Sequence, residues 1–439
     1  MAYFVGFESR DVIRNSHNAR QDSYADRVVR GKILDSEGNV LAKTEVADDG
    51  TETRVYPYGR VFAHVVGYAT QGKTGIESIE NFELLTSNAF FLEKLKTEFQ
   101  DEKNIGDDVV TTLNTNLQQA AYDALGNNKG AVVVMEPSTG QILAMVSKPD
   151  YDPNTVDENW ETLSNSEDSN LLNRATQGLY APGSTFKVVT LLEYMRQNDN
   201  YDYYSYNCTG EIKAGENTIH CYGGKVHGEL SLRDSLAYSC NTSFSNIGST
   251  LDVDDFRSTA KKLLFNKSLP CEFSYSKSRF NLDENSTEAE LMMTSIGQGE
   301  TQVSPYHMAL ITCAIANGGV LMKPYIVDSV QNYTGSVIDK NKPEKYATLM
   351  SSSEASQLKD YMTSVTEYGT ASVLSGQSYT AAGKTGTAEY SSDKEKDHSW
   401  FIGISNVDNP DLVVSVVIES ADGAARAVNV AKAVFDAYY

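Results

Sequence analysis

The stretch LYAPGSTFKVVT, residues 179–190, determines how the rest of this sequence is interpreted. Pro182-Gly183 marks a turn, Ser184 is a residue type favoured at the start of a helix, and an apolar run follows. One helical turn separates Ser184 from Lys187 and brings both side chains to the same face. Taken alone, the stretch is more simply a capped helix with a solvent-exposed lysine. The alternative is a nucleophilic hydroxyl with its own amine base.

Two short motifs later in the chain favour the nucleophile. S-C-N at 239–241 falls at an expected break between two helices in 231–251, and K-T-G-T at 384–387 falls among small and β-branched residues that predict a strand. The motifs S-x-x-K, S-D-N and K-T-G occur together in class A β-lactamases and penicillin-binding proteins. Here S-C-N replaces S-D-N, but the order along the chain is the same. Three motifs in order are far more specific than one, so we predict that Ser184 is a nucleophile.

The sequence resembles the class B penicillin-binding proteins, the monofunctional D,D-transpeptidases of bacterial cell walls, over nearly its whole length. Besides the three motifs, five stretches carry this resemblance: RGKILDSEGNVLA (30–42), GKTGIESIENFELL (72–85), MEPSTGQILAM (135–145), IGQGETQVSP (296–305) and HSWFIG (398–403). The resemblance implies an α+β fold in which an antiparallel sheet is flanked by helices, with a smaller N-terminal pedestal domain. We expect the dimerisation-like pedestal in 1–105 and the transpeptidase domain in 106–439.

The resemblance also implies an activity and a location. The enzyme would cross-link D-Ala-D-Ala stem peptides of peptidoglycan through a serine acyl-enzyme and would be acylated and inhibited by β-lactams. It would lie at the extracytoplasmic face of the bacterial membrane, held by one N-terminal helix, with a membrane glycan polymerase as a possible partner. YFVGFESRD (3–11) resembles sequence just after such a helix, so we expect the helix to be missing from this chain.

The residue types in the motifs suit acyl transfer. A serine hydroxyl is a poor nucleophile unless a base takes its proton. Lys187 can do so only when neutral, and a free lysine has a pKa of about 10.4, so desolvation and a second cation, Lys384, must lower that pKa. Ser239 would relay a proton to the leaving nitrogen of D-alanine.

The other motif residues are expected to bind the substrate. Asn241 suits a peptide amide because it both donates and accepts, although it could instead cap a helix. Lys384, with the hydroxyls of Thr385 and Thr387, would bind the terminal carboxylate, and Gly386 would let a substrate strand lie close. Backbone N–H groups of Ser184 and Thr387 would form the oxyanion hole. Gln298, in a Gly-Gln-Gly turn, is a weaker candidate.

Composition excludes several other classes of protein. The 439 residues include 59 acidic and 37 basic ones, and the net charge of −22 argues against binding to nucleic acid or to an anionic membrane surface. None of the five cysteines forms a C-x-x-C pair and the six histidines show no ligand spacing, so we expect no metal or cofactor. Cys208 and Cys221 flank a short loop, and the sequence does not decide between a disulfide and two free thiols at these positions. No apolar run approaches the roughly 20 residues that span a bilayer.

The pattern of residues also predicts individual elements. We expect strand hairpins in 30–44, 130–147 and 398–420, helices in 112–126 and 424–439, and a loop in the acidic, polar stretch 154–170.

Three other functions share the same motifs. A D,D-carboxypeptidase would let water resolve the acyl-enzyme, a β-lactamase would need an efficient hydrolytic base, and a β-lactam sensor domain would acylate once and signal. The sequence identifies no hydrolytic base, and the 145 positions from Ser239 to Lys384 favour a large transpeptidase over a compact β-lactamase. The sensor reading predicts an N-terminal region with several membrane spans instead of a pedestal.

Overall fold

The computed structural model describes residues 26–89, 102–388, 397–421 and 426–439. The chain divides into two compact units. Unit 1 comprises Met1–Gln119, Ile142–Leu172 and Tyr325–Pro343, and unit 2 comprises Ala120–Gln141, Asn173–Pro324 and Glu344–Tyr439. The expected boundary at residue 105 stays a prediction, and the stretch 3–11 lies outside the described residues. Among the residues described, no helix is long and apolar enough to cross a membrane.

Unit 1 contains a six-stranded mixed sheet with the order β15-β14-β6-β2-β3-β4. In that order its strands are Val337–Lys340, Val327–Gln331, Asp108–Thr111, Ile33–Leu34, Val40–Val46 and Glu52–Val55. The predicted hairpin in 30–44 is confirmed: the carboxylate of Asp35 accepts hydrogen bonds from the backbone N–H groups of Glu37 and Asn39, which closes the turn between β2 and β3. Two further short strands, β1 (Val28–Val29) and β5 (Asn104–Ile105), pair in parallel.

The expectation of a loop in 154–170 is wrong, because helix α7 occupies Val156–Ser164. Val156, Trp160 and Leu163 recur at helical spacing and pack with the buried Tyr68 and Tyr151. Three apolar residues are enough to hold one face of a helix that is otherwise acidic. The remaining helices and strand of unit 1 are η3 (Gly59–Phe62), α2 (Ala63–Val66), α3 (Gly75–Ile79), α4 (Asn81–Leu84), η4 (Pro153–Thr155) and β8 (Ile142–Lys148).

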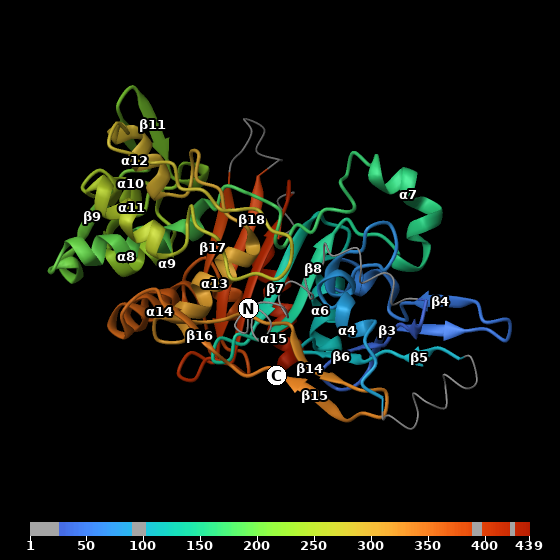
Figure 1. Ribbon diagram of the computed structural model, residues 1–439. Coiled ribbons are helices and arrows are strands. Elements are labelled where there is room, and N and C mark those ends of the chain that lie inside the picture. Colours follow the sequence, from blue (N-terminus) through green and yellow to red (C-terminus); the bar gives the residue numbers. More distant parts are fainter. Residues whose placement is uncertain (1–25, 90–101, 389–396, 422–425) are drawn as a thin grey trace. The chain divides into compact units, whose positions relative to one another are not determined.

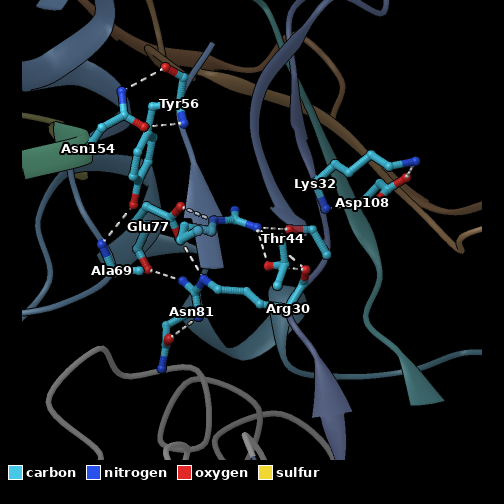
Figure 2. A network of polar contacts seen from close by, with 11 residues as sticks. Arg30, Lys32, Thr44, Tyr56, Ala69, Glu77, Asn81, Asp108 and Asn154 are labelled. Carbon is cyan, nitrogen blue, oxygen red and sulfur yellow. Dashed lines mark hydrogen bonds and ion pairs between the residues drawn. The ribbon is translucent and has the colours of Figure 1, made fainter. Parts of the chain in front are cut away.

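A buried ion network joins the strands of unit 1 to its short helices (Figure 2). The carboxylate of Glu77, in α3, accepts from Arg30 Nε at 2.6 Å and from Arg54 Nε at 2.7 Å. Arg30 also donates to the Asn81 side chain and to the Glu77 carbonyl. Burial alone would raise the pKa of Glu77, but the two guanidinium groups lower it below its usual value. One carboxylate therefore balances two buried cations.

Unit 2 is built on an antiparallel sheet, which Figure 1 shows with its strands side by side. The strands of this sheet that belong to unit 2 run in the order β17 (Ala381–Ala388), β18 (His398–Ser405), β19 (Leu412–Ile418) and β7 (Gly130–Met135), and β8 (Ile142–Lys148) follows β7 in the strand order. Every residue of β19 and β7 is buried, which explains why both strands are apolar except for Ser415 in β19. The helices α13 (Pro305–Ala316), α14 (Ser352–Glu367) and α15 (Ala427–Tyr438) pack against this sheet. The expected α+β fold, with an antiparallel sheet flanked by helices, is confirmed.

The rest of unit 2 carries the helices that position the candidate site. Phe186 lies fully buried among the rings of Phe256, Phe265 and Phe280. The helix α6 (Thr115–Leu125) contains the boundary between the units at residue 119. The remaining elements of unit 2 are η5 (Gly183–Phe186), α8 (Lys187–Gln197), η6 (Tyr201–Tyr203), β9 (Ser205–Cys208), β10 (Glu211–Ala214), β11 (Asn217–His220), η7 (Tyr222–Gly224), β12 (Gly228–Ser231), α9 (Leu232–Ala237), α10 (Asn241–Gly248), α11 (Val253–Lys262), α12 (Glu288–Ser295), β13 (Val320–Met322), β16 (Lys345–Thr348) and η8 (Ser372–Leu374). The predicted helices in 112–126 and 231–251 and the predicted strands in 130–147 and 398–420 are confirmed. The helix predicted in 424–439 is confirmed by α15, while residues 424 and 425 lie outside the described residues.

Replacing Glu77 with alanine should strongly destabilise the folded chain. The variant leaves two guanidinium groups buried without their counter-charge, which costs about 3–5 kcal/mol in comparable buried pairs. Glu45→Ala is the matched control, since Glu45 pairs with Lys43 at the surface and such pairs contribute about 0–1 kcal/mol. Urea unfolding of both variants measures the difference. Equal losses of stability would show that the Glu77 network does not hold unit 1 together.

Candidate active site

Ser184 lies inside the 3-10 turn η5, which leads directly into α8 at Lys187. The serine is therefore within the turn and is not its N-cap, in contrast to the simple capped helix considered from the sequence. Two hydrogen bonds fix the approach to this turn: Trp400 Nε1 donates to Ala181 O at 3.1 Å, and Thr185 Oγ1 donates to Pro182 O at 2.7 Å. With Phe186 held in the aromatic cluster, the backbone around Ser184 has little freedom to move.

Three glycines allow neighbouring segments to approach this turn. Gly183 has φ +52° and donates its N–H to Gly297 O at 2.9 Å. A Cβ on Gly297 would lie only 1.9 Å from Gly183 O. A Cβ on Gly386, in β17, would lie 3.0 Å from Thr185 Cγ2. Gly386 is buried, and its lack of a side chain makes room for the Ser184 turn. The sequence alone did not indicate this packing reason for a glycine at 386.

The hydroxyl of Ser239 lies between two buried amines. Lys187 Nζ lies 3.3 Å from Ser239 Oγ and donates to Ser239 O at 2.8 Å and to Asn241 Oδ1 at 2.7 Å. Lys384 Nζ donates to the same Oγ at 2.9 Å and to Thr385 O at 2.9 Å. Both lysines are fully buried. The fold thus joins residues that lie 145 positions apart in the sequence.

Burial sets the protonation state of both amines. It lowers the pKa of Lys187 to about 7, against an opposing effect of charge at Cys240 and Cys221. Burial is also the main cause that lowers the pKa of Lys384 well below its ordinary value, and the charge of Lys187 adds to it. The predicted depression of the Lys187 pKa thus has desolvation as its principal cause, while the repulsion between the two cations acts on Lys384. A neutral amine is available at Lys187 near neutral pH.

The S-C-N segment forms a tight turn between α9 and α10. Ser239 has φ +55°, an unfavourable value for a residue with a side chain. Cys240 caps α10, its Sγ accepting from Ser243 N, so the helix-cap role considered for Asn241 belongs to its neighbour. The Asn241 side chain instead accepts from Lys187 and donates to His220 O at 3.0 Å.

Strand β17 presents the K-T-G-T residues in alternation. Lys384 and Gly386 are buried, whereas Thr385 and Thr387 are partly exposed. Within the described chain, β17 lies at the edge of its sheet and pairs with β18 alone. Thr385 Oγ1 also lies 2.6 Å from Thr370 Oγ1, a residue that sequence reasoning missed because it follows α14 in a polar stretch without a motif.

A cleft in unit 2 brings most of the predicted residues together. Six of them line it: Ser184, Ser239, Asn241, Thr385, Gly386 and Thr387. Gln298, the weaker candidate, also lines it, together with Thr370, Trp400 and Tyr238. Lys187 and Lys384 are buried and reach the cleft through the hydroxyl of Ser239. The arrangement offers an accessible hydroxyl, two buried amines and an open strand edge.

Two protein-family models match different parts of this chain. Residues 130–439 match the model of the penicillin-binding protein transpeptidase domain, and residues 30–109 match that of the penicillin-binding protein A dimerisation domain. The peptidoglycan D,D-transpeptidase PbpA of Mycobacterium tuberculosis is 33% identical over 440 residues, which cover 93% of this chain and 88% of that protein. PbpA of Mycolicibacterium smegmatis is 32% identical, with 92% and 88% covered.

Solved structures agree with these matches. Penicillin-binding protein A from M. tuberculosis, in a ceftriaxone acyl-enzyme complex, superposes with a TM-score of 0.85 at 30% identity, covering 95% of this chain and 99% of that one. The D,D-transpeptidase domain of a peptidoglycan glycosyltransferase from Eggerthella lenta gives a TM-score of 0.84 at 34% identity, covering 94% and 98%.

Replacing Gly297 with alanine should destabilise the candidate site more than the same change at Gly299. Both glycines have positive φ, +76° and +81°, so each alanine incurs the left-handed penalty of about 1–2 kcal/mol. Only at Gly297 does the new Cβ overlap a backbone atom, Gly183 O; at Gly299 the nearest atom is Thr294 Oγ1 at 3.7 Å. Thermal unfolding should therefore show a clearly larger loss for Gly297→Ala. Equal shifts in melting temperature would mean that the contact with Gly183 is unimportant.

Proposed function

Because this chain belongs to the penicillin-binding protein transpeptidases, we propose that it is a peptidoglycan D,D-transpeptidase that forms an acyl-enzyme on Ser184. The observation that carries the proposal is the hydroxyl of Ser239 between the amines of Lys187 and Lys384, beside the turn that holds Ser184. A serine nucleophile needs a base to accept its proton, and the leaving nitrogen needs a proton donor; a neutral Lys187 and the Ser239 hydroxyl can supply these two functions.

Acylation would begin with proton transfer from Ser184 to Lys187. The Ser184 oxygen attacks the carbonyl carbon between the two D-alanines of a stem peptide, and the carbonyl oxygen becomes an oxyanion. The backbone N–H groups of Ser184 and Thr387 are the proposed donors to that oxyanion. The close approach of the Ser184 turn to β17, shown at Gly183 and Thr387, supports this pairing. Losing one such donor typically costs about 10²–10³ in rate.

The proton then has a path to the leaving group. Lys187 is within reach of Ser239 Oγ, which can pass a proton to the departing D-alanine nitrogen as the C–N bond breaks. Lys384, hydrogen-bonded to the same oxygen, would favour release of that proton by stabilising negative charge on it. The amine of a second stem peptide then attacks the ester, Ser184 recovers its proton, and the cross-link is complete.

The edge of β17 is the proposed place for the substrate. An edge strand exposes unpaired backbone groups, so the peptide could add as a further strand. Thr385 and Thr387 face the cleft with their hydroxyls available to the terminal carboxylate. A carboxylate bound there would also favour the charged form of Lys384. Asn241, held by Lys187 and His220 O, would contact the peptide amide.

β-Lactams would acylate Ser184, as ceftriaxone, imipenem and penicillin G acylate penicillin-binding protein A of M. tuberculosis.

We also propose two domains, a pedestal in residues 1–105 and a transpeptidase domain in residues 106–439. The protein would lie at the outer face of the cell membrane, held by an N-terminal anchor, with a glycan polymerase as its partner. The match of residues 30–109 to a dimerisation domain supports the pedestal.

Ser184→Ala should abolish the covalent adduct that the unaltered chain forms with benzylpenicillin, because the attacking oxygen is gone. Ser239→Ala keeps the nucleophile but loses the relay, so its adduct should form about 10²–10⁴-fold more slowly. Intact-protein mass spectrometry over time measures both rates.

An adduct that persists on Ser184→Ala would refute the assignment of the nucleophile. An adduct that disappears quickly while penicillin is consumed would make the protein a β-lactamase. With a D-Ala-D-Ala peptide, product formed only with water and never with an amine acceptor would make it a D,D-carboxypeptidase. A stable β-lactam adduct with no turnover of the peptide would indicate a sensor domain.

Acylation should slow as the pH falls through about 7. Burial lowers the pKa of Lys187 to about 7, and only the neutral amine can accept the proton of Ser184. The neutral fraction, and with it the acylation rate constant, should drop roughly tenfold between about pH 8 and pH 6. Lys225→Ala, which removes an exposed lysine of the cleft, should keep this profile, whereas Lys187→Arg should be slow at every pH. A profile that is flat between pH 6 and pH 8 would exclude Lys187 as the base.

A further inference from the structure

Four potential metal ligands meet beside the candidate active site. The sulfur atoms of Cys208, Cys221 and Cys240 and a ring nitrogen of His227 all lie within 4.8 Å of one another. Cys221 Sγ lies 3.7 Å from both Cys208 Sγ and Cys240 Sγ, and Cys208 Sγ lies 3.3 Å from His227 Nδ1. The three cysteines are almost fully buried. From the sequence we expected no metal site, because these four residues are not separated by the short spacings that are typical of zinc motifs.

The fold explains how dispersed residues meet. Strand β9 ends at Cys208, which is paired with Gly228 at the start of β12, so His227 lies directly beside it. Cys221 follows the β10–β11 hairpin, and its backbone N–H donates to Gly210 O. Cys240 lies in the turn before α10. Each ligand therefore comes from the end of a different regular element.

We propose that Cys208, Cys221, His227 and Cys240 bind one Zn²⁺ ion in a tetrahedral Cys₃His site. Zn–S bonds are about 2.3 Å long, so two sulfurs on a zinc tetrahedron are about 3.8 Å apart. The two S···S distances of 3.7 Å match this edge. Thiolate-rich tetrahedral sets select zinc over the hard cations Mg²⁺ and Ca²⁺. Binding releases the protons of the three thiols, and the neutral imidazole binds through Nδ1.

The surroundings complete such a site. Thr242 Oγ1 lies 3.2, 3.3 and 3.6 Å from the three sulfurs, and Ser243 N donates to Cys240 Sγ at 3.4 Å. Outer donors of this kind orient metal-binding thiolates. A disulfide accounts for the cluster less well, because it can join only two of the three sulfurs and leaves a thiol and an imidazole beside it. Two disulfides compete with the metal site: Cys208–Cys221, the pair left open from the sequence, and Cys221–Cys240, whose sulfurs are equally close.

The ion would hold the catalytic turn, a consequence that rests on the proposed function. Cys240 is the residue between Ser239 and Asn241, and His220 O, which accepts from Asn241, directly precedes Cys221. Fixing Cys240 to Cys208 and Cys221 would therefore keep Ser239 in its strained backbone conformation and Asn241 in contact with Lys187. Of the four ligands, His227 lines the cleft and the three cysteines do not. The zinc ligands would therefore act by positioning Ser239 and Asn241.

The test measures metal first and acylation second. The full chain is exported to an oxidising compartment in zinc-supplemented medium, purified without chelator, and its zinc content is measured by elemental mass spectrometry. We expect one zinc per chain, a large loss of zinc in Cys208→Ser and Cys221→Ser, and none in Cys271→Ser, a matched cysteine outside the cluster. His227→Cys, which preserves four ligands, should keep the metal. Cobalt(II) in place of zinc should give the intense visible bands of a tetrahedral thiolate site.

The second measurement is the rate of acylation by benzylpenicillin. Removing zinc with a chelator should slow benzylpenicillin acylation at least tenfold, and adding Zn²⁺ back should restore it in the unaltered chain but not in Cys208→Ser. Full acylation without zinc would refute the positioning role while leaving the site itself standing. Zinc-free protein with a mapped disulfide from Cys221 to either Cys208 or Cys240, or with three free thiols that take up no zinc or cobalt, would overturn the site. The metal content is independent of Ser184, so these results remain decisive if the proposed function fails.

Discussion

The burial of two lysine amines around one serine hydroxyl is the constraint on which this site depends. An ammonium group at Lys187 is disfavoured by burial, and a pKa lowered from 10.5 to about 7 corresponds to about 5 kcal/mol relative to water. The fold must supply that free energy elsewhere, from the aromatic cluster at Phe186 and from the apolar strands behind β17. As a result, an amine that would otherwise be charged can be neutral near pH 7, and Lys384 donates a hydrogen bond to the same hydroxyl.

Such an arrangement requires backbone segments to lie closer than side chains normally permit. The Ser184 turn, the Gly297 turn and β17 meet at points where a Cβ would overlap its neighbour. Glycine at these points is therefore a packing requirement, and the same contacts bring the turn that holds Ser184 next to Thr387. Positive φ at Ser239 fits this view, since strain at a functional residue persists only where surrounding contacts fix it.

Sequence reasoning reached the α+β fold and the grouping of Ser184, Ser239, Asn241 and the K-T-G-T strand because each motif carries a local structural signal. It failed where the signal was not local. The helix α7 is held by three apolar residues in an acidic segment, and Thr370 enters the cleft through tertiary contact alone. The cysteine and histidine cluster escaped notice because its four members come from the ends of separate elements, so no spacing rule could join them.

Cys240, the middle residue of the S-C-N motif, connects the candidate active site with the cysteine and histidine cluster. In the proposed mechanism, Ser239 and Asn241 have chemical roles and the residue between them has none. Cysteine at 240 does more, because its sulfur caps α10 and also lies 3.7 Å from Cys221. A residue that is buried outside the cleft and contacts a second structural element can tie the turn at Ser239 to the hairpin that carries His220 O. The proposed relay would then depend on a cluster that takes no part in the proposed chemistry, because the contacts of Cys240 would help to hold Ser239 between the two amines.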